Sequence, residues 1–480
     1  MVPATALRAH SGRSTIRKPV PKLTFVPDAA NTLDVREEGI RRSHHKPLRF
    51  DMFCMEYSQA DEVPVELRHR PLVYQPLEQR LTGAFMRLLA FSVSVALLCA
   101  PALAGIKEKV AGVAPSGVVL VLDGGGNELV AQNAGKSFVP ASVAKIVTAW
   151  LAMEVLGRDH RFQTRFYLDS DRVLYVRGGG DPFLVSEELA LLAPELVAAT
   201  GKEPFTGMVL DASYYPQELR IPGIEDTGRA YDALNSALAV NFNTIHAVKK
   251  GKSVRSAEQQ TPITPLAVSQ FLKRGPKGRG RISLAQEDPS VGVRYAGELL
   301  AVFIEKAGGS VEGEISIGSI PEGLEPVYVH RQSRALPEIL TQMLLGSNNY
   351  VANQIFLEVG AHRLGGPVSL AKSHKVAQAI LAEHGITEGI DLKEGSGIST
   401  RNRFSTQGLA RVLAEFAPNA ELLPRTKAGS RYKTGTIPGV KALAGYVNTT
   451  KYGLVPFVIS LGGKTGKTRF RLLRALELGL

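Results

Sequence analysis

A hydroxyl and an amine lie three residues apart in the segment Ser142-Val143-Ala144-Lys145. On a helix this spacing places both side chains on one face and within reach of each other, as a nucleophile and its base must be. Lys145 is the only charged residue between Ser142 and Met153, in a stretch that is otherwise largely apolar. Because burying an ammonium is costly unless its pKa falls or it is paired, this environment suits a lysine that acts as a base.

The Ser-x-x-Lys spacing is a weak signal by itself. The chain holds it twice more, at Ser369 to Lys372 and at Ser430 to Lys433. A lysine on an apolar helix can also extend its ammonium to the surface. The sequence therefore leaves a structural role for Lys145 open beside the catalytic one.

A second polar group stands at Ser347-Asn348-Asn349, between two helical segments at 336–345 and 350–358. The pattern predicts a tight helix-to-helix junction that points into a cleft. A hydroxyl there could pass a proton, and a carboxamide could hold a substrate amide. An asparagine-rich helix cap is the structural alternative.

A third group is Lys433-Thr434-Gly435-Thr436, which precedes Ile437-Pro438-Gly439 and a further apolar strand. We interpret it as one arm of a hairpin, in which Gly435 lets a ligand approach the backbone while Lys433 and the threonine hydroxyls suit a carboxylate. A second Lys-Thr-Gly begins at Lys464. It does not favour a nucleotide site, because Leu461 stands where a phosphate loop needs glycine.

The elements that must position these groups follow from hydrophobic periodicity and turn residues. A hairpin is expected from Val118–Leu122 across the turn at 123–127 to a strand at 129–131. A buried helix should run from Ser142 to Leu156 and end at Gly157. Later expectations are strands at 173–177 and 208–211, a polar, basic, loop-rich stretch at 249–281, a helix at 295–307, and paired strands at 441–448 and 454–461.

The segment that begins at Met86-Arg87 has the form of a secretory signal. An apolar region at 88–98 precedes Ala102-Leu103-Ala104, which supplies the small-x-small cleavage site. A membrane anchor is the alternative, at a length that is short for crossing a bilayer. We therefore expect a signal peptide at 86–104, export to the periplasm, and a preface at 1–85 that is disordered or not translated.

Charge and cysteine content limit the binding partners and the kinds of site that the chain can have. The formal charge of +12 fits nucleic acid, an acidic membrane surface or an anionic cell-wall polymer. Basic residues form no run of five, so nucleic-acid binding is not favoured, while peripheral association with membrane or wall stays open. Cys54 and Cys99 are too few for a disulfide framework, and we expect no metal and no cofactor.

The three motifs in this order, Ser-x-x-Lys, Ser-x-Asn and Lys-Thr-Gly, together resemble the active-site signature of penicillin-binding proteins and serine β-lactamases. Within that superfamily the chain resembles the class C low-molecular-mass penicillin-binding proteins, the penicillin-binding protein 4 type, over residues 112–480. The long separation of Ser142 from Ser347 leaves room for an inserted domain. Further matching stretches are Gly180-Asp181-Pro182, Val240-Asn241-Phe242-Asn243, Glu394 to Asn402, and Leu443 to Tyr446.

The resemblance implies an α+β fold: a transpeptidase-like domain from 105–166 and 325–480, an antiparallel sheet flanked by helices, interrupted by a β-rich insert at 167–324. It implies a serine D-Ala-D-Ala carboxypeptidase/endopeptidase that cleaves peptidoglycan stem peptides and binds β-lactams covalently. The implied catalytic residues are Ser142 as nucleophile, Lys145 as base, Ser347, Asn349 and Lys433. The implied substrate-binding residues are Thr434, Gly435, Thr436 and Asp226, the last for the free amine of the diamino acid, with Glu225 as its rival.

The sequence departs from the family pattern in three places. The insert is shorter around 249–281, which suggests a reduced third domain; Glu394 stands where aspartate is common; and the loop at 418–431 lacks a glycine-rich segment. The balance between carboxypeptidase and endopeptidase work therefore stays open. Two alternatives remain: a β-lactamase or esterase of the same fold, and a non-catalytic cell-wall binding protein.

Overall fold

The computed structural model describes residues 105–284, 288–463 and 466–480, which fall within one compact unit, Pro76–Leu480. The expected signal peptide, the preface, both cysteines and the start of the second Lys-Thr-Gly lie outside the described residues. No helix in the described ranges is long and apolar enough to cross a membrane.

Both ends of the described chain meet in a five-stranded antiparallel sheet with the order β13-β14-β15-β1-β2. The expected hairpin is confirmed as β1 and β2, and the expected C-terminal pair as β14 and β15. Strand β13, which carries Lys433, is one of the two edge strands. The strands are β1 (Val118–Leu122), β2 (Glu128–Gln132), β13 (Arg431–Ile437), β14 (Val440–Thr449) and β15 (Gly453–Gly462).

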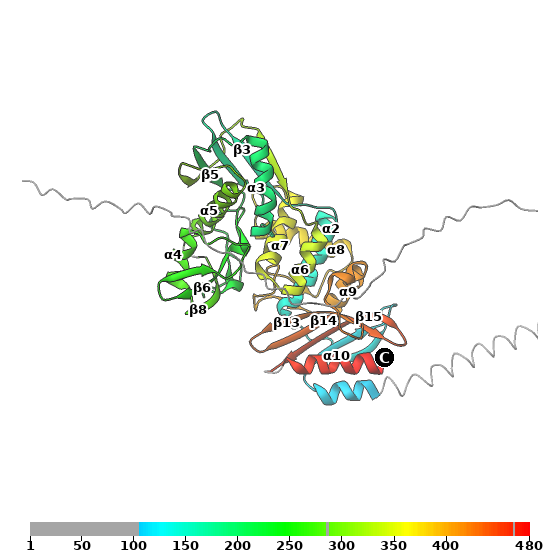
Figure 1. The fold of residues 1–480 in the computed structure, drawn as a ribbon. Helices are drawn as coiled ribbons and strands as arrows, with labels where there is room; N and C mark the ends of the chain where they lie inside the picture. The colour runs from blue at the N-terminus through cyan, green and yellow to red at the C-terminus, as the bar shows by residue number, and fades with distance from the viewer. Residues whose placement is uncertain (1–104, 285–287, 464–465) are drawn as a thin grey trace, which may run out of the picture. The chain divides into compact units, whose positions relative to one another are not determined.

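Alternating side chains of this sheet enter two separate cores, as the two-residue period of a strand requires. On β14, Leu443 and Val447 face α10 (Lys467–Gly479) and the helical residues 105–113, whereas Ala442 and Tyr446 face the remaining helices. Figure 1 shows α10 and the N-terminal helix together on one side of the sheet. The sheet is thus buried on both faces.

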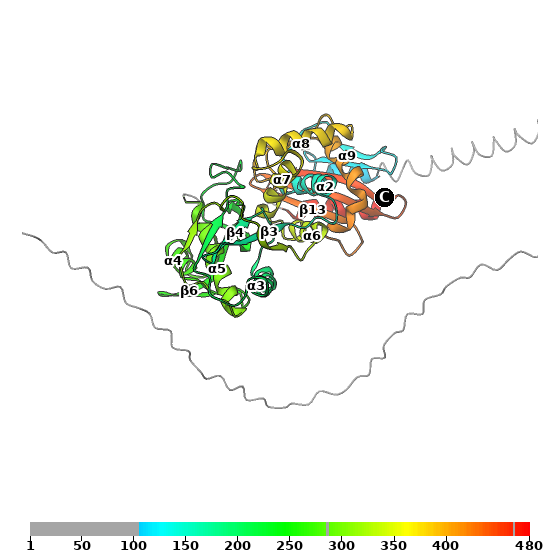
Figure 2. The same cartoon turned by 90° about the horizontal axis from the view of Figure 1, so that it is seen from above.

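The helical layer on the other face contains the predicted helix α2 at its centre (Figure 2). The first turn is a 3-10 helix, Ala141–Val143, so the α-helix itself begins two residues later than expected. Ten of its thirteen residues are buried, which confirms that the helix is internal. The helices are α2 (Ala144–Leu156), α6 (Leu336–Gly346), α7 (Asn349–Leu364), α8 (Leu370–Glu383) and α9 (Thr406–Phe416).

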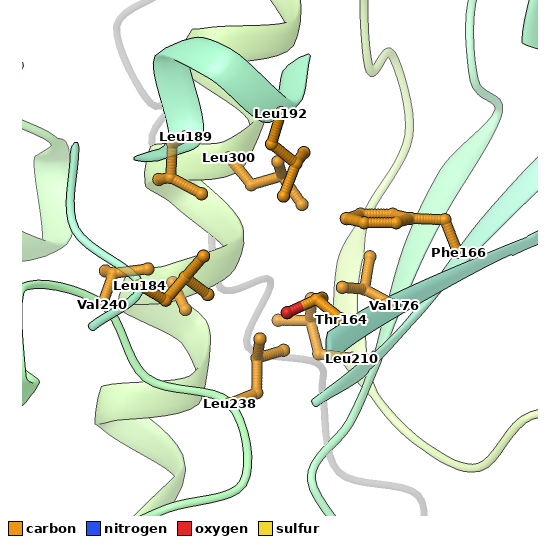
Figure 3. A pocket seen from close by; sticks show the side chains of 11 residues that line it. Thr164, Phe166, Val176, Leu184, Leu189, Leu192, Leu210, Leu238, Val240 and Leu300 are labelled. Atoms are coloured by element: carbon orange, nitrogen blue, oxygen red, sulfur yellow. The ribbon is translucent and has the colours of Figure 1, made fainter. Parts of the chain in front are cut away.

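The chain between α2 and α6 builds a second five-stranded sheet with the order β10-β3-β4-β5-β9. Its apolar face packs on α3 (Ser186–Thr200) and α5 (Ser290–Lys306) around a small apolar cavity of about 10 Å³. Figure 3 shows Leu189, Leu192 and Leu300 across this cavity from Phe166 and Val176. The strands are β3 (Gln163–Leu168), β4 (Val173–Gly178), β5 (Gly207–Asp211), β9 (Ile315–Ile317) and β10 (Pro326–Arg331).

The prediction of a loop-rich stretch at 249–281 was wrong. This region forms the sheet β7-β6-β8 and helix α4 (Pro265–Arg274). Thr264 caps the helix, because its Oγ1 accepts a hydrogen bond from the Ala267 N–H. Proline then occupies the first helical position. Phe271 and Ala267 then anchor it in the core of the insert. The strands are β6 (Thr244–Lys250), β7 (Ser253–Ser256) and β8 (Gly278–Ser283).

These layers confirm the expected α+β fold, with helices on an antiparallel sheet and a β-rich insertion between α2 and α6. Strands β3 and β10 pair with each other where the chain enters and leaves the insertion. The domain boundaries at residues 166 and 325 stay a prediction. Two short strands, β11 (Ile390–Asp391) and β12 (Arg403–Phe404), flank the loop that supports the site described next.

Candidate active site

Ser142 lies in the 3-10 turn that leads into α2, beside the edge strand β13. The preceding Ala141 is buried and holds a left-handed φ of 49°, which costs energy for a residue with a Cβ. The side chains of Ala141 and Val143 anchor the turn in the protein. The serine hydroxyl is therefore presented from a well-fixed backbone.

Lys145 is completely buried one helical turn further on. Its Nζ lies 3.1 Å from Ser142 Oγ, 2.8 Å from Asn349 Oδ1 and 2.7 Å from the Ser396 carbonyl oxygen. Burial, and secondarily repulsion from Lys433, hold the pKa of this amine well below its usual value, although Glu394 opposes the shift. The alternative in which Lys145 reaches the surface is wrong.

The carbonyl that binds Lys145 belongs to a loop at 394–402 built around a buried carboxylate. Glu394 accepts hydrogen bonds from the N–H and hydroxyl of Ser396 and from the Asn402 side chain. At Gly397, φ is 80°, and a Cβ there would overlap the carbonyl oxygen of Ala141. Only glycine lets this loop lie against the serine turn.

The Ser347 junction is a sharp turn between α6 and α7, as predicted. Ser347 has left-handed angles of φ 52° and ψ 38°, and Asn348 caps α7 by accepting from the Val351 N–H at 3.2 Å. The cap interpretation therefore holds for Asn348. It does not hold for Asn349, whose Oδ1 accepts from Lys145 and whose Nδ2 donates to the Tyr231 carbonyl oxygen of the insert at 3.3 Å.

Lys433 on β13 is the second buried lysine, with only 2% of its surface exposed. Its Nζ donates to Ser347 Oγ at 2.9 Å and to the Thr434 carbonyl oxygen at 3.0 Å. Burial, and to a lesser extent repulsion from Arg469, lower its pKa to about 8. Ser142, Lys145, Asn349, Ser347 and Lys433 are thus brought together by hydrogen bonds and by the proximity of their charges.

Arg469 on α10 was missed in the sequence, where it is one of many arginines. Its Nη1 donates to the carbonyl oxygens of Gly435 and Ala442 at 2.7 and 3.0 Å, and to Thr436 Oγ1 at 3.0 Å. The side chain is 9% exposed. It ties β13 to the helix behind the sheet and places a fixed positive charge near Lys433.

Gly435 is required by close packing, because a Cβ there would overlap the Pro140 carbonyl oxygen. Thr434 is half-buried and Thr436 is exposed at the same edge. The Thr434 carbonyl points to the lysine that binds Ser347. Because backbone direction alternates along a strand, Thr436 turns its N–H to the same side as Thr434.

Asp226, the expected amine ligand, is exposed in the insert and forms an ion pair with Arg274, Nη2 to Oδ1 at 2.6 Å. Within the described ranges no hydrogen bond or ion pair joins it to the serine and lysine residues above. Its rival Glu225 is exposed beside it. Tyr231, five residues after Asp226, accepts a hydrogen bond from Asn349 through its carbonyl oxygen, so this segment of the insert borders the site.

In the other two Ser-x-x-Lys stretches the serines have structural roles, as does Lys372. Ser369 caps α8, and Lys372 donates to the carbonyl oxygens of Gly365 and Pro367. Ser430 donates to Glu477 at 2.7 Å. Among the described residues no cluster of His, Cys, Asp or Glu could hold a metal.

Comparison with known proteins identifies the family. The sequence matches the family described as D-Ala-D-Ala carboxypeptidase 3 (S13) over residues 104–271 and 277–428. The chain belongs to this family. It is therefore a serine-type peptidase, and the resemblance drawn from the motifs is confirmed. The match ends before Lys433, which the structure brings to Ser347.

Two curated relatives align with about three quarters of this chain. A D-alanyl-D-alanine carboxypeptidase from an Actinomadura species is 28% identical over 438 residues, covering 76% of this chain and 81% of the relative. The D-alanyl-D-alanine carboxypeptidase DacB of Haemophilus influenzae is 24% identical over 416 residues, covering 73% and 86%. The structure of penicillin-binding protein 4 from H. influenzae aligns with a TM-score of 0.63 at 20% identity, over 77% of this chain and 98% of that one, and supports the fold.

Proposed function

We propose that this protein is an exported serine D-Ala-D-Ala carboxypeptidase and endopeptidase, which hydrolyses peptidoglycan stem peptides through an acyl-enzyme on Ser142. The observation that carries the proposal is the position of Lys145. Its amine lies 3.1 Å from the serine hydroxyl and 2.8 and 2.7 Å from two carbonyl-type oxygens. No other hydroxyl in the motif set has a buried amine of this kind on its own helix.

The lysine geometry suits a neutral base. A neutral amine has two N–H donors and one lone pair. If the donors bind Asn349 Oδ1 and the Ser396 carbonyl oxygen, the lone pair is left for the Ser142 hydroxyl proton. The lowered pKa of Lys145 favours this state at neutral pH. Ser142 Oγ then attacks the D-Ala-D-Ala carbonyl as its proton passes to Lys145.

The departing D-alanine needs a proton on its amine, and we propose that Ser347 relays to it the proton that Lys145 took from Ser142. The Ser347 hydroxyl is bound at 2.9 Å by Lys433, whose pKa of about 8 lets it hold or release a proton near neutrality. The N–H groups of Ser142 and Thr436 are the proposed oxyanion donors, each contributing roughly 3 kcal/mol. Water then attacks the ester carbonyl as Lys145 takes a proton from it, and Lys145 returns that proton to Ser142 Oγ as the peptide leaves.

We assign recognition of the substrate to residues on β13, on α7 and in the insert. Thr434, Gly435, Thr436 and Lys433 would bind the terminal carboxylate, and Asn349 the peptide amide. Asp226 would bind the free amine of the diamino acid, in competition with Arg274, which already pairs with it. We expect a weak amine preference, and Asp226→Asn should reduce the difference in kcat/KM between peptides with a free and an acetylated side-chain amine.

Two further features belong to the proposal. β-Lactams should acylate Ser142 in place of the peptide, in line with a β-lactam complex of penicillin-binding protein 4 from H. influenzae.

The segment at 86–104 should export the chain to the periplasm, where peptidoglycan is found. Recovery of the cell-made protein with residues 1–85 attached would contradict the expected start at Met86.

The proposal is tested by D-alanine release. The full chain and Ser142→Ala are incubated with a synthetic peptide ending in D-Ala-D-Ala, and free D-alanine is measured. We expect release by the wild type and none by the variant. Rapid penicillin hydrolysis without D-alanine release would instead indicate a β-lactamase, and absence of both activities a wall-binding protein.

A further inference from the structure

A second cavity, distinct from the serine and lysine site, opens between the insert and the helical layer. It has a volume of about 950 Å³, and none of Ser142, Lys145, Ser347 or Lys433 lines it. Its walls come from the segment that follows α2, from β3, β4 and β10, and from the end of α7. We call it the arginine cleft, after Arg161, Arg165, Arg177 and Arg331, which line it.

Three of these arginines lie on one face of the insert sheet. Arg165 on β3 is directly opposite Arg177 on β4, and Arg331 on β10 is opposite Gln163, two residues from Arg165. All three are exposed. The other face of the same strands carries the apolar residues around the small cavity in Figure 3. Like charges directly opposite each other destabilise a sheet, so this arrangement has a cost that the fold does not require.

Few protein carboxylates balance these arginines. Arg177 Nε lies 3.8 Å from Asp211 Oδ2, whereas Arg165 donates to the Gln163 carboxamide at 3.2 Å. Arg161 donates to the Gln332 carbonyl oxygen at 2.8 Å. In the described ranges no carboxylate lies within ion-pair distance of Arg161, Arg165 or Arg331. Their charge is therefore available to a ligand.

The buried acid in the lining of the cleft supplies little counter-charge. Glu358 is 7% exposed and accepts from Tyr215 Oη at 2.8 Å and Tyr214 Oη at 3.1 Å. Burial raises its pKa to about 8, so it is largely protonated at neutral pH. Asp159 remains as the one other acid in the lining. At neutral pH, therefore, the cleft carries a net positive charge.

We propose that the arginine cleft binds a chain of phosphate groups, as a second site separate from the peptidase centre. A tetrahedral phosphate offers oxygens to two guanidinium groups at once, which suits the facing pair Arg165 and Arg177. Arg331, which is one strand across from Arg165 and two residues along, is placed to bind the next phosphate. Such a site would hold the enzyme on a phosphate-bearing polymer while Ser142 works on peptide.

The test uses the full chain with tripolyphosphate as probe and poly-L-glutamate as a carboxylate polyanion, with binding measured by calorimetry. Arg165→Gln/Arg177→Gln should weaken tripolyphosphate binding by roughly tenfold or more, and Arg331→Gln by less. The matched control is Arg255→Gln/Arg279→Gln, which removes the same charge from the exposed face of the other insert sheet. It should leave binding nearly unchanged. Acylation by benzylpenicillin, unchanged in all variants, reports correct folding.

Three results would overturn the proposal: no saturable tripolyphosphate binding, equal affinity for poly-L-glutamate, or equal losses in the cleft variants and the control. If the double variant does not fold, Arg331→Gln decides, because a loss restricted to that cleft substitution supports the site and an unchanged affinity contradicts it. Penicillin acylation is measured separately, so failure of this proposal leaves the proposed peptidase function unaffected.

Discussion

The serine and lysine site and the arginine cleft both bury an ionisable group and shift its pKa towards the neutral form. Lys145 and Lys433 are shifted down, and Glu358 is shifted up to about 8. The partners differ. Lys145 lies against a hydroxyl that can attack, whereas Glu358 accepts from two phenols whose own pKa values are raised by burial and by its charge. A perturbed pKa therefore indicates catalysis only where a nucleophile and a proton acceptor are adjacent.

The largest expected effect tests whether the buried amine is the base. Lys145→Met should lower acylation by benzylpenicillin by roughly a thousandfold, because the hydroxyl proton loses its acceptor. Lys372→Met is the matched control, since Lys372 has the same Ser-x-x-Lys spacing but binds two backbone carbonyls. It should acylate like the wild type, as followed by stopped-flow fluorescence. Equal rates for both variants would remove the distinction between the two lysines.

The next prediction concerns the loop that orients Lys145. Gly397→Ala should lower the rate of acylation by about a hundredfold. The new methyl group would overlap the Ala141 carbonyl oxygen, so either the loop or the serine turn must move and Lys145 loses its alignment with Ser142. Gly385→Ala has a similar positive φ, of 69°, with no described atom within 4 Å of the new methyl. It should cost about 1–2 kcal/mol of stability and leave acylation unchanged. An active Gly397→Ala protein would show that the close approach is not needed.

A smaller effect is expected from the charge behind β13. Burial and, after it, Arg469 lower the pKa of Lys433, so Arg469→Met should raise that pKa. Because Lys433 is proposed to bind the substrate carboxylate as a cation, the alkaline limb of the kcat/KM profile should move to higher pH. The rate near neutrality should change little, and the rate on the alkaline limb should rise by roughly severalfold. Arg469→Lys, which keeps the charge, should shift the limb less. A uniform loss at every pH would indicate a purely structural role.

The smallest effect on activity is expected in the cleft. The pKa of Glu358 is raised from 4.5 to about 8, so the folded state holds a proton that the unfolded state releases. This contribution to stability is complete below pH 4.5 and is lost as the pH rises through 8, on the order of a few kcal/mol. Glu358→Gln should show a flatter dependence of unfolding free energy on pH, with acylation unchanged. The buried Asp181, whose pKa is raised to about 6, contributes to both proteins and cancels in the difference.

A parallel slope in the two proteins would contradict the assignment of that proton to Glu358. Urea unfolding at several pH values measures the slope directly. The result would also affect the arginine cleft, because a charged Glu358 would offset one of its arginines.

The residues that meet in the candidate site could be predicted from the sequence because each occurs in a short motif whose spacing already fixes its local geometry. Ser142 and Lys145 share one helical turn, and Lys433 and Gly435 share one strand. The long helices and the C-terminal strands were also predictable, since apolar periodicity dominates them. Where sequence neighbours determine contacts, the sequence was sufficient.

Features that depend on distant contacts could not be predicted. Arg469 acts on β13 from a helix that follows two strands later, and nothing in its local sequence marks it. Gly397 is constrained by Ala141, far away in the chain. The region at 249–281 was mistaken for loop because its charge masked a short helix, although Thr264-Pro265 followed by Ala267 and Phe271 was an available start signal.

Mass spectrometry of the acylated protein shows whether Ser142 is the nucleophile. The full chain, Ser142→Ala and Lys372→Met are incubated with benzylpenicillin, and the adduct is located by peptide mapping. We expect one penicilloyl group on Ser142 in the wild type and Lys372→Met, and none in Ser142→Ala. An adduct on another residue, or unmodified wild type with intact penicillin, would contradict it.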